Sequence, residues 1–250
     1  MARNLPAVMK ALVVCATAVT VMACGGSSHP TGASPTRTAT RTATPSTPTP
    51  SPTADNETIQ VFASGVGTYE LQAEPVAILH NLAANHTALG VVVDFTVHSP
   101  SGTHALDSSP DVSLFPDQTL AVAALCTDMC DNATSTAVAV TVGSWAQGGG
   151  SALTASSPVY TCVDSGDALG CAPGGDSQGT VSGTVSGTAQ TFEQIELTGV
   201  CTSAAGVIVD SGTVATVWPG GASATMTVSV LGSPRPATCQ LYAVAIRPGR

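Results

Sequence analysis

The chain contains few charged and few aromatic residues. Charged side chains make up 9% of the 250 residues and aromatic side chains 4%, whereas about a quarter of an average soluble domain is charged. Threonine, serine, alanine, valine and glycine take their place. Valine and threonine suit a pleated sheet, and glycine interrupts helices. The composition therefore favours an all-β fold.

Basic residues are scarcest in the last two hundred residues. All sixteen acidic residues lie between Asp55 and Asp210, and only Arg235, Arg247 and Arg250 are basic from Asp55 onward, which leaves a net charge of about −13. Such a charge repels phosphate backbones, which proteins hold with lysine and arginine. We therefore exclude nucleic acid as a partner. The region also has no lysine, which excludes Schiff-base catalysis there.

Several motifs that carry common chemistry are absent. The sequence has no H-E-x-x-H zinc motif, no G-x-x-x-x-G-K-[ST] phosphate loop and no G-x-G-x-x-G that opens a helix. We expect no cofactor, no metal and no enzymatic activity. Paired catalytic carboxylates, as in glycosidases, stay open as an alternative because such partners meet in space rather than in sequence.

Only one long apolar run occurs, from Ala11 to Ala23. Its thirteen residues are too few for a helix that spans a bilayer, which needs about 20. Arg3 and Lys10 precede the run and small residues end it. This arrangement is typical of a signal peptide, which we assign to residues 1–23.

The end of this run, Val21-Met22-Ala23-Cys24, resembles the lipobox of bacterial lipoproteins. The resemblance implies that a diacylglycerol is attached to the Cys24 thiol and that cleavage makes Cys24 the first mature residue. Acyl chains of this kind anchor a protein to a lipid bilayer, at about 0.8 kcal/mol per buried CH₂. The implied location is the extracytoplasmic face of a bacterial membrane. A plain secretory signal is the alternative.

Residues 24–56 form a segment rich in serine, threonine and proline. It has no hydrophobic period and nothing to bury, so we expect it to be disordered. Pro45, Pro48, Pro50 and Pro52 favour polyproline II, which rises about 3.1 Å per residue. About 30 such residues make a semi-stiff tether that reaches up to about 90 Å.

In the rest of the chain, apolar and polar residues alternate, which predicts half-buried strands. The apolar members are Val91, Val93, Phe95 and Val97 in one segment, and Ile195 and Leu197 in another, which alternate with Gln194 and Glu196. The segment from Val76 to Ala84 permits either a short helix or a strand.

An internal repeat divides this part into two units. Asp107 leads to Phe115-Pro116 in the first, and Asp210 leads to Trp218-Pro219 in the second, each followed by a small-residue strand. Units of about 95 residues match the size of an immunoglobulin-like domain. We therefore predict two antiparallel immunoglobulin-like β-sandwiches, at residues 57–150 and 151–250.

The first unit resembles the FxLYD-type extracytoplasmic domain, a small immunoglobulin-like sandwich of bacterial lipoproteins. The matching text covers about 40 residues, in Asn81, Asn85 to Val97, Ser101-Gly102 and Leu114 to Thr119. The second unit fits less well, because Leu197 to Cys201 stands where the family has an aromatic-rich strand. The resemblance implies an exported, non-enzymatic accessory or adhesion-type domain.

Six cysteines remain besides Cys15 in the signal and Cys24. An even number in an exported chain predicts disulfides. Fifteen pairings are possible, of which we favour neighbours: Cys126–Cys130, Cys162–Cys171 and Cys201–Cys239. Zinc is the rival interpretation, although C-x₃-C without a companion pair matches a zinc site poorly.

Histidines and aromatic residues are the remaining candidates for a site. Four of the five histidines, His80, His86, His98 and His104, lie in the first unit. His98 and His104, with Asp94 or Asp107, could bind a metal if paired strands bring them together; exposed, solvated histidines are the alternative that we favour. The candidate contact aromatics, which we expect in the core instead, are Trp145, Trp218, Tyr160 and Tyr242.

Together these features predict a cell-envelope lipoprotein that displays non-catalytic β-sandwich domains. Its partners are the lipid bilayer, through Cys24, and an envelope protein or a glycan. The alternative is an extracytoplasmic hydrolase, directed at glycans or esters, on the same scaffold.

Overall fold

The computed structural model describes residues 55–69, 72–107, 112–127, 130–150, 152–163, 177–187, 194–232 and 236–246. The predicted signal peptide, Cys24 and the tether up to residue 54 lie outside them. The described residues form strands, turns and irregular segments, without a helix. Within them, accordingly, no helix is long and apolar enough to cross a membrane. The expected all-β fold is confirmed.

Fourteen strands are described. They are β1 (Ile59–Tyr69), β2 (Gln72–Asn81), β3 (His86–Ser99), β4 (Gly102–Asp107), β5 (Val112–Leu114), β6 (Thr119–Ala123), β7 (Cys126–Thr127), β8 (Ser135–Gln147), β9 (Thr154–Val163), β10 (Ser177–Ser186), β11 (Gln194–Thr202), β12 (Ile208–Val217), β13 (Ser223–Gly232) and β14 (Thr238–Ile246).

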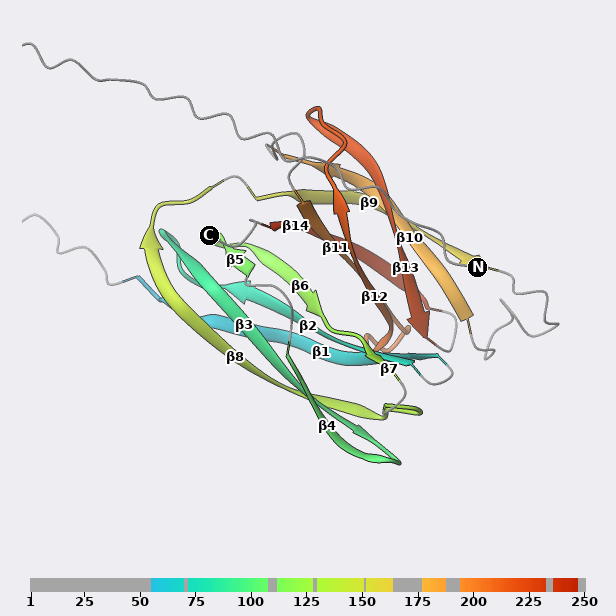
Figure 1. Cartoon of the computed structure of the whole chain (residues 1–250). Coiled ribbons are helices and arrows are strands. Elements are labelled where there is room, and N and C mark those ends of the chain that lie inside the picture. The colour runs from blue at the N-terminus through green and yellow to red at the C-terminus, as the bar shows by residue number, and fades with distance from the viewer. Residues whose placement is uncertain are drawn as a thin grey trace, which may run out of the picture. The chain divides into compact units, whose positions relative to one another are not determined.

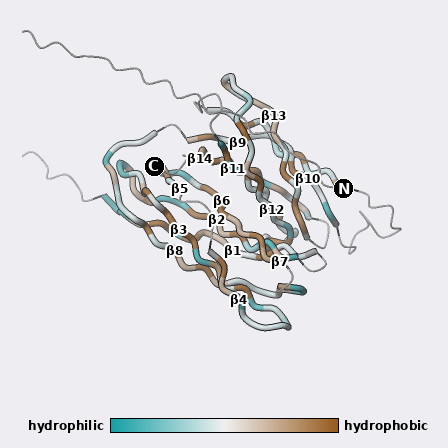
Figure 2. The backbone as a smooth tube through the Cα atoms, viewed as in Figure 1, coloured by the Kyte–Doolittle hydropathy of each residue, from teal (hydrophilic) through white to brown (hydrophobic). Residues whose placement is uncertain are grey.

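These strands form three antiparallel sheets (Figure 1). Sheet A has the order β1-β2-β6, with β7 also paired to β2. In sheet B, β3 pairs with β4 and β5 and also with β8. Sheet C has the order β14-β11-β12-β13-β10-β9. Figure 2 shows apolar stretches on strands of all three sheets.

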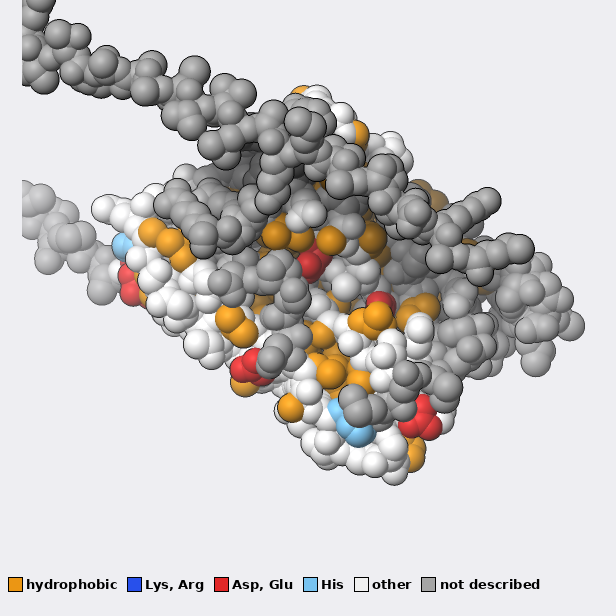
Figure 3. All heavy atoms as spheres, in the orientation of Figure 1, with side chains coloured by type: hydrophobic (Ala, Val, Ile, Leu, Met, Phe, Trp, Pro, Cys, Tyr) orange, Lys and Arg blue, Asp and Glu red, His pale blue; other side chains and the backbone are white. Residues whose placement is uncertain are grey.

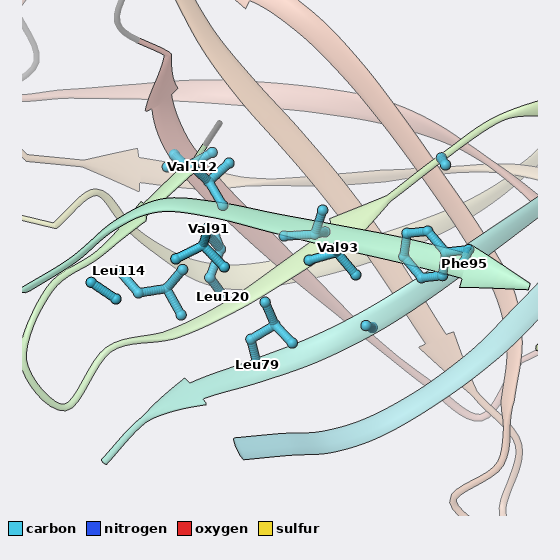
Figure 4. Close-up of a cluster of buried hydrophobic side chains, with 12 residues drawn as sticks. Leu79, Val91, Val93, Phe95, Val112, Leu114 and Leu120 are labelled. Atoms are coloured by element: carbon cyan, nitrogen blue, oxygen red, sulfur yellow. The ribbon is translucent and has the colours of Figure 1, made fainter. Parts of the chain in front are cut away.

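Sheets A and B pack face to face around one apolar cluster, which we call cluster 1. In β3 the predicted alternation is present, since Val91, Val93, Phe95 and Val97 are all buried. The first three of them meet Leu79 of β2 in cluster 1, and Figure 4 shows these side chains pointing into the space between the strands. Alternate residues of a strand point to one face, so a single run of valines supplies one wall of this layer.

Sheet C encloses a second cluster on its own. Its two end strands, β14 and β9, lie against each other, and the cluster between the strands includes Ile195, Leu197 and Trp218. The Trp218 side chain is only 1% exposed. Burial of Trp218 agrees with the sequence-based expectation that it is a core residue.

Sheet A is a middle layer, because both of its faces are covered. On β2, Ala77 and Leu79 face sheet B in cluster 1, whereas Val76 and Ile78 meet Val200 of β11 in a third cluster. The segment for which helix and strand were both open is therefore a strand, β2, up to Asn81. Burial on both faces explains its continuous apolar run.

The two predicted units are packed together. The boundary after residue 150 falls between β8 and β9, and residues 51–250 form one compact unit. In the first unit two sheets face each other, and in the second the strands belong to one six-stranded sheet. The division into two β-sandwich domains, at residues 57–150 and 151–250, stays a prediction.

Candidate functional site

A cleft of about 630 Å³ opens between the start of β6, the start of β9 and β14. Its volume lies within the range of small-molecule sites, about 300–1,000 Å³. The lining residues are Pro116, Asp117, Gln118, Thr119, Ala152, Leu153, Thr154, Ala155, Pro158, Cys239, Gln240, Leu241, Tyr242 and Ala243. They comprise one carboxylate and several amide, hydroxyl and apolar groups, without a cation.

Two amide side chains and a phenol supply most of the cleft's polar groups. The Tyr242 hydroxyl donates to Gln240 Oε1, and burial raises the pKa of Tyr242. Gln118 Oε1 accepts a hydrogen bond of 2.8 Å from the backbone N–H of Phe115. These groups can bind a ligand by hydrogen bonds, but none of them is an activated nucleophile.

The one carboxylate of the cleft, Asp117, lies at its rim. Its side chain is 89% exposed, and Asp117 Oδ1 lies 3.3 Å from His80 Nε2. His80 Nδ1 in turn lies 2.9 Å from Thr119 Oγ1. Asp117 has a left-handed backbone, with φ 56°, a conformation that aspartate tolerates better than most residues. General acid–base catalysis by a pair of carboxylates would need a second carboxylate beside Asp117, and Asp117 is the one carboxylate that lines the cleft.

Three carboxyl groups are buried elsewhere in the fold. Glu74 and Glu196 are 6% exposed, and Asp210 is fully buried. Burial raises the pKa of Glu74 to about 8, although the backbone N–H of Thr213 donates to it and lowers the pKa in part. Burial alone raises the pKa of Glu196 and of Asp210 to about 7.

These buried carboxyls form no part of the cleft, and no lysine or arginine occurs among the described residues to pair with them (Figure 3). Within the described structure, Glu74 Oε2, Glu196 Oε1 and both Asp210 oxygens have no hydrogen-bond partner. A carboxyl in such surroundings keeps its proton, because its charged form would lack solvation. The three groups are therefore largely neutral at mildly acidic pH.

Glu196 corrects a sequence-based expectation. Its alternation with Ile195 and Leu197 placed it on a solvent face, and this is wrong. Ile195 and Leu197 face the cluster inside sheet C, while Glu196 is on the other face of β11 with Val200, which contacts sheet A. Both faces of β11 are therefore covered.

A carboxylate fixes the start of the described chain. Asp55 accepts hydrogen bonds from the backbone N–H groups of Ala84 (2.8 Å) and Asn85 (2.9 Å), and Asp55 Oδ2 lies 2.6 Å from His86 Nδ1. His86 Nε2 also lies 3.8 Å from Glu57. The hydrogen bond to His86, followed by that to Ala84, lowers the pKa of Asp55 to about 2. The predicted tether thus joins the fold at the beginning of β3.

The histidines are not gathered into a metal site in the described residues. His98 pairs with Thr103 and His104 with Val97 in adjacent positions of the β3–β4 ladder, so the two imidazoles project to opposite faces. Asp94 pairs with Asp107 four residues further along. No group of three His, Cys, Asp or Glu side chains among the described residues could hold a metal. The β3–β4 ladder therefore does not bring His98 and His104 together, as the metal-site alternative would require.

Two of the predicted disulfides are present. Cys126 is bonded to Cys130 and Cys201 to Cys239. Cys162 is also disulfide-bonded, and its predicted partner, Cys171, lies outside the described residues. The first bond is buried in a small cluster with Val97 and Ala133. The second joins directly opposed residues of β11 and β14.

Three of the four candidate contact aromatics lie partly buried against the cores. Trp145 and Tyr242 pack on cluster 1 and Tyr160 on the cluster inside sheet C, while Trp218 belongs to the latter. The exposed aromatic that sequence reasoning missed is Phe62, at 72% exposure. It is the extra residue where the β1–β2 register shifts between Val61 and Ala63.

One nucleophile-like motif also occurs, G-x-S-x-G at residues 175–179. In α/β-hydrolases this motif forms a sharp turn from a strand into a helix. Here Ser177 is the first residue of β10, which continues to Ser186 as a strand. The surroundings of the motif therefore do not match a nucleophile elbow.

No protein-family model matches this chain, and no curated protein or solved structure matches it significantly. The resemblances to the lipobox and to the FxLYD-type domain stay predictions.

Proposed function

We propose that this chain is a bacterial envelope lipoprotein, anchored through Cys24, whose β-rich region is a non-catalytic module for binding or for a structural role. The disulfides are the observation that carries the proposal. Cys126–Cys130 and Cys201–Cys239 are bonded, and disulfides persist in oxidising compartments outside the cytoplasm. An exported chain with Cys24 at the end of a signal-like apolar run is then suited to lipidation.

The chemistry of the cleft supports a binding role over catalysis. Its described lining has amides, hydroxyls and apolar side chains around a single rim carboxylate, Asp117. A retaining or inverting glycosidase uses two carboxyl groups across the bond that it cleaves. An ester hydrolase uses a nucleophile with a base in hydrogen-bond reach. A neutral ligand with several hydroxyl or amide groups, such as a glycan, suits these side chains best.

The tether gives the module its reach. About 30 residues with a polyproline tendency extend up to about 90 Å, enough to carry the folded region well beyond the lipid headgroups. Asp55 holds the end of this segment on the fold through Ala84, Asn85 and His86. The module is thus displayed at a distance from the bilayer and joined to its tether at a defined point.

Mass spectrometry of the mature protein from bacterial membranes tests the proposal. We expect an N-terminal peptide that begins at Cys24 and carries a diacylglycerol, and a gain of about 2 Da per disulfide on reduction. A Cys24→Ser variant should carry no lipid, because serine has no thiol to which the diacylglycerol can be attached. An intact Met1 form in the cytosol, with free thiols, would contradict both export and anchoring.

A further inference from the structure

The cleft lies where the two predicted units meet. The first unit contributes the turn from Pro116 to Thr119, and the second contributes Ala152 to Ala155, Pro158 and Cys239 to Ala243. Ligand sites are common at such a junction between two parts of a fold. The polar groups of these two walls therefore decide which ligand suits the cleft.

Gln118 presents an amide from the first wall in a fixed orientation. Its backbone N–H donates to the oxygen of Phe115 (3.1 Å), and its backbone oxygen accepts the N–H of Asn81 (3.0 Å). The side-chain oxygen, Oε1, accepts the N–H of Phe115 at 2.8 Å. Because a backbone N–H can donate only to an acceptor, this bond also fixes which end of the amide is the amino group, Nε2.

The amino group of Gln118 is left for a ligand. Gln118 is only 9% exposed, lines the cleft, and has no partner for Nε2 among the described residues. A deeply buried donor without a hydrogen bond costs free energy, so water or a ligand must accept from it. A donor that the fold already holds in place loses little freedom when a ligand binds.

Gln240 presents a second amide from β14. The Tyr242 hydroxyl donates to Gln240 Oε1, so the oxygen of this amide is also occupied, and its Nε2 is unpaired in the part of the chain that the structure describes. Gln240 and Tyr242 are on the same side of β14, because alternate residues of a strand share a face. Each wall of the cleft therefore offers one amide amino group.

These two donors suit a ligand with neutral acceptor oxygens. An anionic ligand is disfavoured, because Asp117 lies at the rim and the described residues include no lysine or arginine. The region from Asp55 onward carries about −13, which also repels anions. Among neutral groups, a carbonyl oxygen accepts hydrogen bonds through two lone pairs. The cleft thus favours a carbonyl over a carboxylate or a phosphate.

The rest of the lining suits a methyl group and hydroxyls. Leu153, Leu241 and Ala243 line the cleft and are buried members of the cluster inside sheet C. Thr119 and Thr154 add hydroxyl groups to the same lining. An acetamido group joins a carbonyl oxygen to a methyl group, and a sugar ring that carries it adds hydroxyls. The lining therefore matches an N-acetylated amino sugar in each of its parts.

We propose, on the basis of the binding role proposed above, that the cleft binds a neutral glycan through an N-acetylated amino sugar. Gln118 Nε2 donates to the acetamido carbonyl oxygen and sets the preference for this sugar. Gln240 Nε2 donates to another oxygen of the same glycan. A peptide also offers a carbonyl oxygen, but it leaves the hydroxyls of Thr119 and Thr154 without partners, so the sugar is favoured.

NMR titration of the full chain carrying Cys24→Ser tests the proposal without lipid. The probes are the β-1,4-linked trisaccharides of N-acetylglucosamine and of glucose, which differ only in an acetamido group or a hydroxyl on each ring. We expect the N-acetylated trisaccharide to bind about tenfold more tightly. It should shift the side-chain amide signals of Gln118 and Gln240. The signal of Gln178 should stay in place, because this exposed residue lies at the other end of β10 from Ser186, which pairs with Thr154.

Three substitutions of glutamine by glutamate make the same change at different places. Gln118→Glu keeps an oxygen for the Phe115 N–H but loses the donor, so it should weaken the N-acetylated trisaccharide about tenfold and the glucose trisaccharide less than about twofold. Gln240→Glu keeps the acceptor for Tyr242 and should weaken both trisaccharides alike. Gln178→Glu is the matched control and should change neither.

Equal binding of the two trisaccharides by the unsubstituted cleft would overturn the proposal, as would an unchanged preference in a folded Gln118→Glu variant. If that variant does not fold, the comparison of the two trisaccharides still decides. The N-acetylated dipeptide amide of alanine has the carbonyl and methyl groups without a sugar, and tighter binding of this probe would refute a glycan.

Failure of this proposal is distinguishable from failure of the proposed function. The absence of any shift with all three probes at about 10 mM would refute the ligand class. A protein that carries lipid on Cys24 and binds none of the probes would leave the proposed anchoring intact. A chain that binds the N-acetylated trisaccharide but keeps Met1 in the cytosol would refute the anchoring and not the cleft.

Discussion

Sheet A has two covered faces that are built differently. Its face toward sheet B meets mainly apolar groups, including Leu79, Phe95 and Leu120 in cluster 1, and its buried polar side chain there, Asn81, is an amide that donates to the backbone oxygen of Leu114. Its face toward sheet C has a smaller apolar cluster around Val76 and Val200. The second face also buries the carboxyl groups of Glu74 and Glu196 and the hydroxyl of Ser211.

The difference suggests that the stability of one buried layer depends on pH and that of the other does not. Apolar burial scales with area and does not depend on pH. A buried carboxyl without hydrogen-bond partners is tolerated only while it is protonated. The layer between sheets A and B should therefore be stable across the pH range, and the layer between sheets A and C should weaken as pH rises.

The largest effect on stability is expected from a substitution that leaves a cavity in cluster 1, between sheets A and B. Phe95 is 1% exposed in cluster 1, and Phe95→Ala should lower the free energy of unfolding by about 3–5 kcal/mol. Urea denaturation at pH 5 and at pH 8 measures it. The loss should be the same at both pH values, because the buried members of cluster 1 are all apolar side chains and tyrosine, which packs against them, titrates only near pH 10 or above. A loss confined to one pH would contradict the comparison.

The layer between sheets A and C, which buries carboxyl groups, should lower the free energy of unfolding by about 2–3 kcal/mol as pH rises. The pKa of Glu74 is raised to about 8 in the folded chain, against about 4.3 for free glutamate. The unfolded chain ionises first, so stability is highest below about pH 4.5 and falls until about pH 8, where the folded carboxyl also ionises. Glu196 and Asp210, raised to about 7, add to the same trend.

The variant Glu74→Gln isolates this effect. Glutamine keeps the shape of the side chain but cannot ionise, so the fall in Tm between pH 5 and pH 8 should become shallower. Asp94→Asn is the control, because Asp94 is exposed on β3 and its substitution should leave the slope unchanged. A wild-type Tm that rises from pH 5 to pH 8 would refute buried, protonated carboxyls in this layer.

Removal of one hydroxyl from the layer between sheets A and C should lower the free energy of unfolding by less, about 1–2 kcal/mol. Ser211 Oγ accepts the backbone N–H of Gly67 at 3.1 Å and donates to the backbone oxygen of Glu74, so it joins β12 to β1 and β2. Ser211→Ala leaves both buried backbone groups without that partner. Thermal unfolding measures the loss, and Ser229→Ala, at an exposed position of β13, should change Tm little. Equal losses in both variants would deny Ser211 this role.

The sequence predicted half-buried strands well and fully buried strands poorly. The alternation of Val91, Val93 and Phe95 marks the inner face of β3 because the other face of sheet B is open to water. In β2 the same reasoning left Val76 to Ala84 undecided, since a strand covered on both sides has no polar face. Glu196 was misplaced for the same reason.

Most contacts between distant segments could not be predicted from the sequence. Neighbour pairing of cysteines gave Cys126–Cys130 and Cys201–Cys239, because the first is local and the second joins paired strands. Nothing in the spacing of His98 and His104 shows that adjacent ladder positions send them to opposite faces. The cleft likewise depends on β6 and β14 meeting, a matter of tertiary packing.

The smallest effect on global stability is expected at the junction with the tether, which belongs to neither covered face of sheet A. Asp55 accepts the N–H groups of Ala84 and Asn85 and contacts His86. Asp55→Asn should leave Tm within error, because the residue only orders the chain end, but it should speed amide exchange at Ala84 and Asn85 and proteolysis near residue 55. In the wild type the pKa of about 2 keeps this contact intact down to about pH 3, and it is lost as pH falls further. Unchanged exchange in Asp55→Asn would show that β2 and β3, and not the carboxylate, hold this turn.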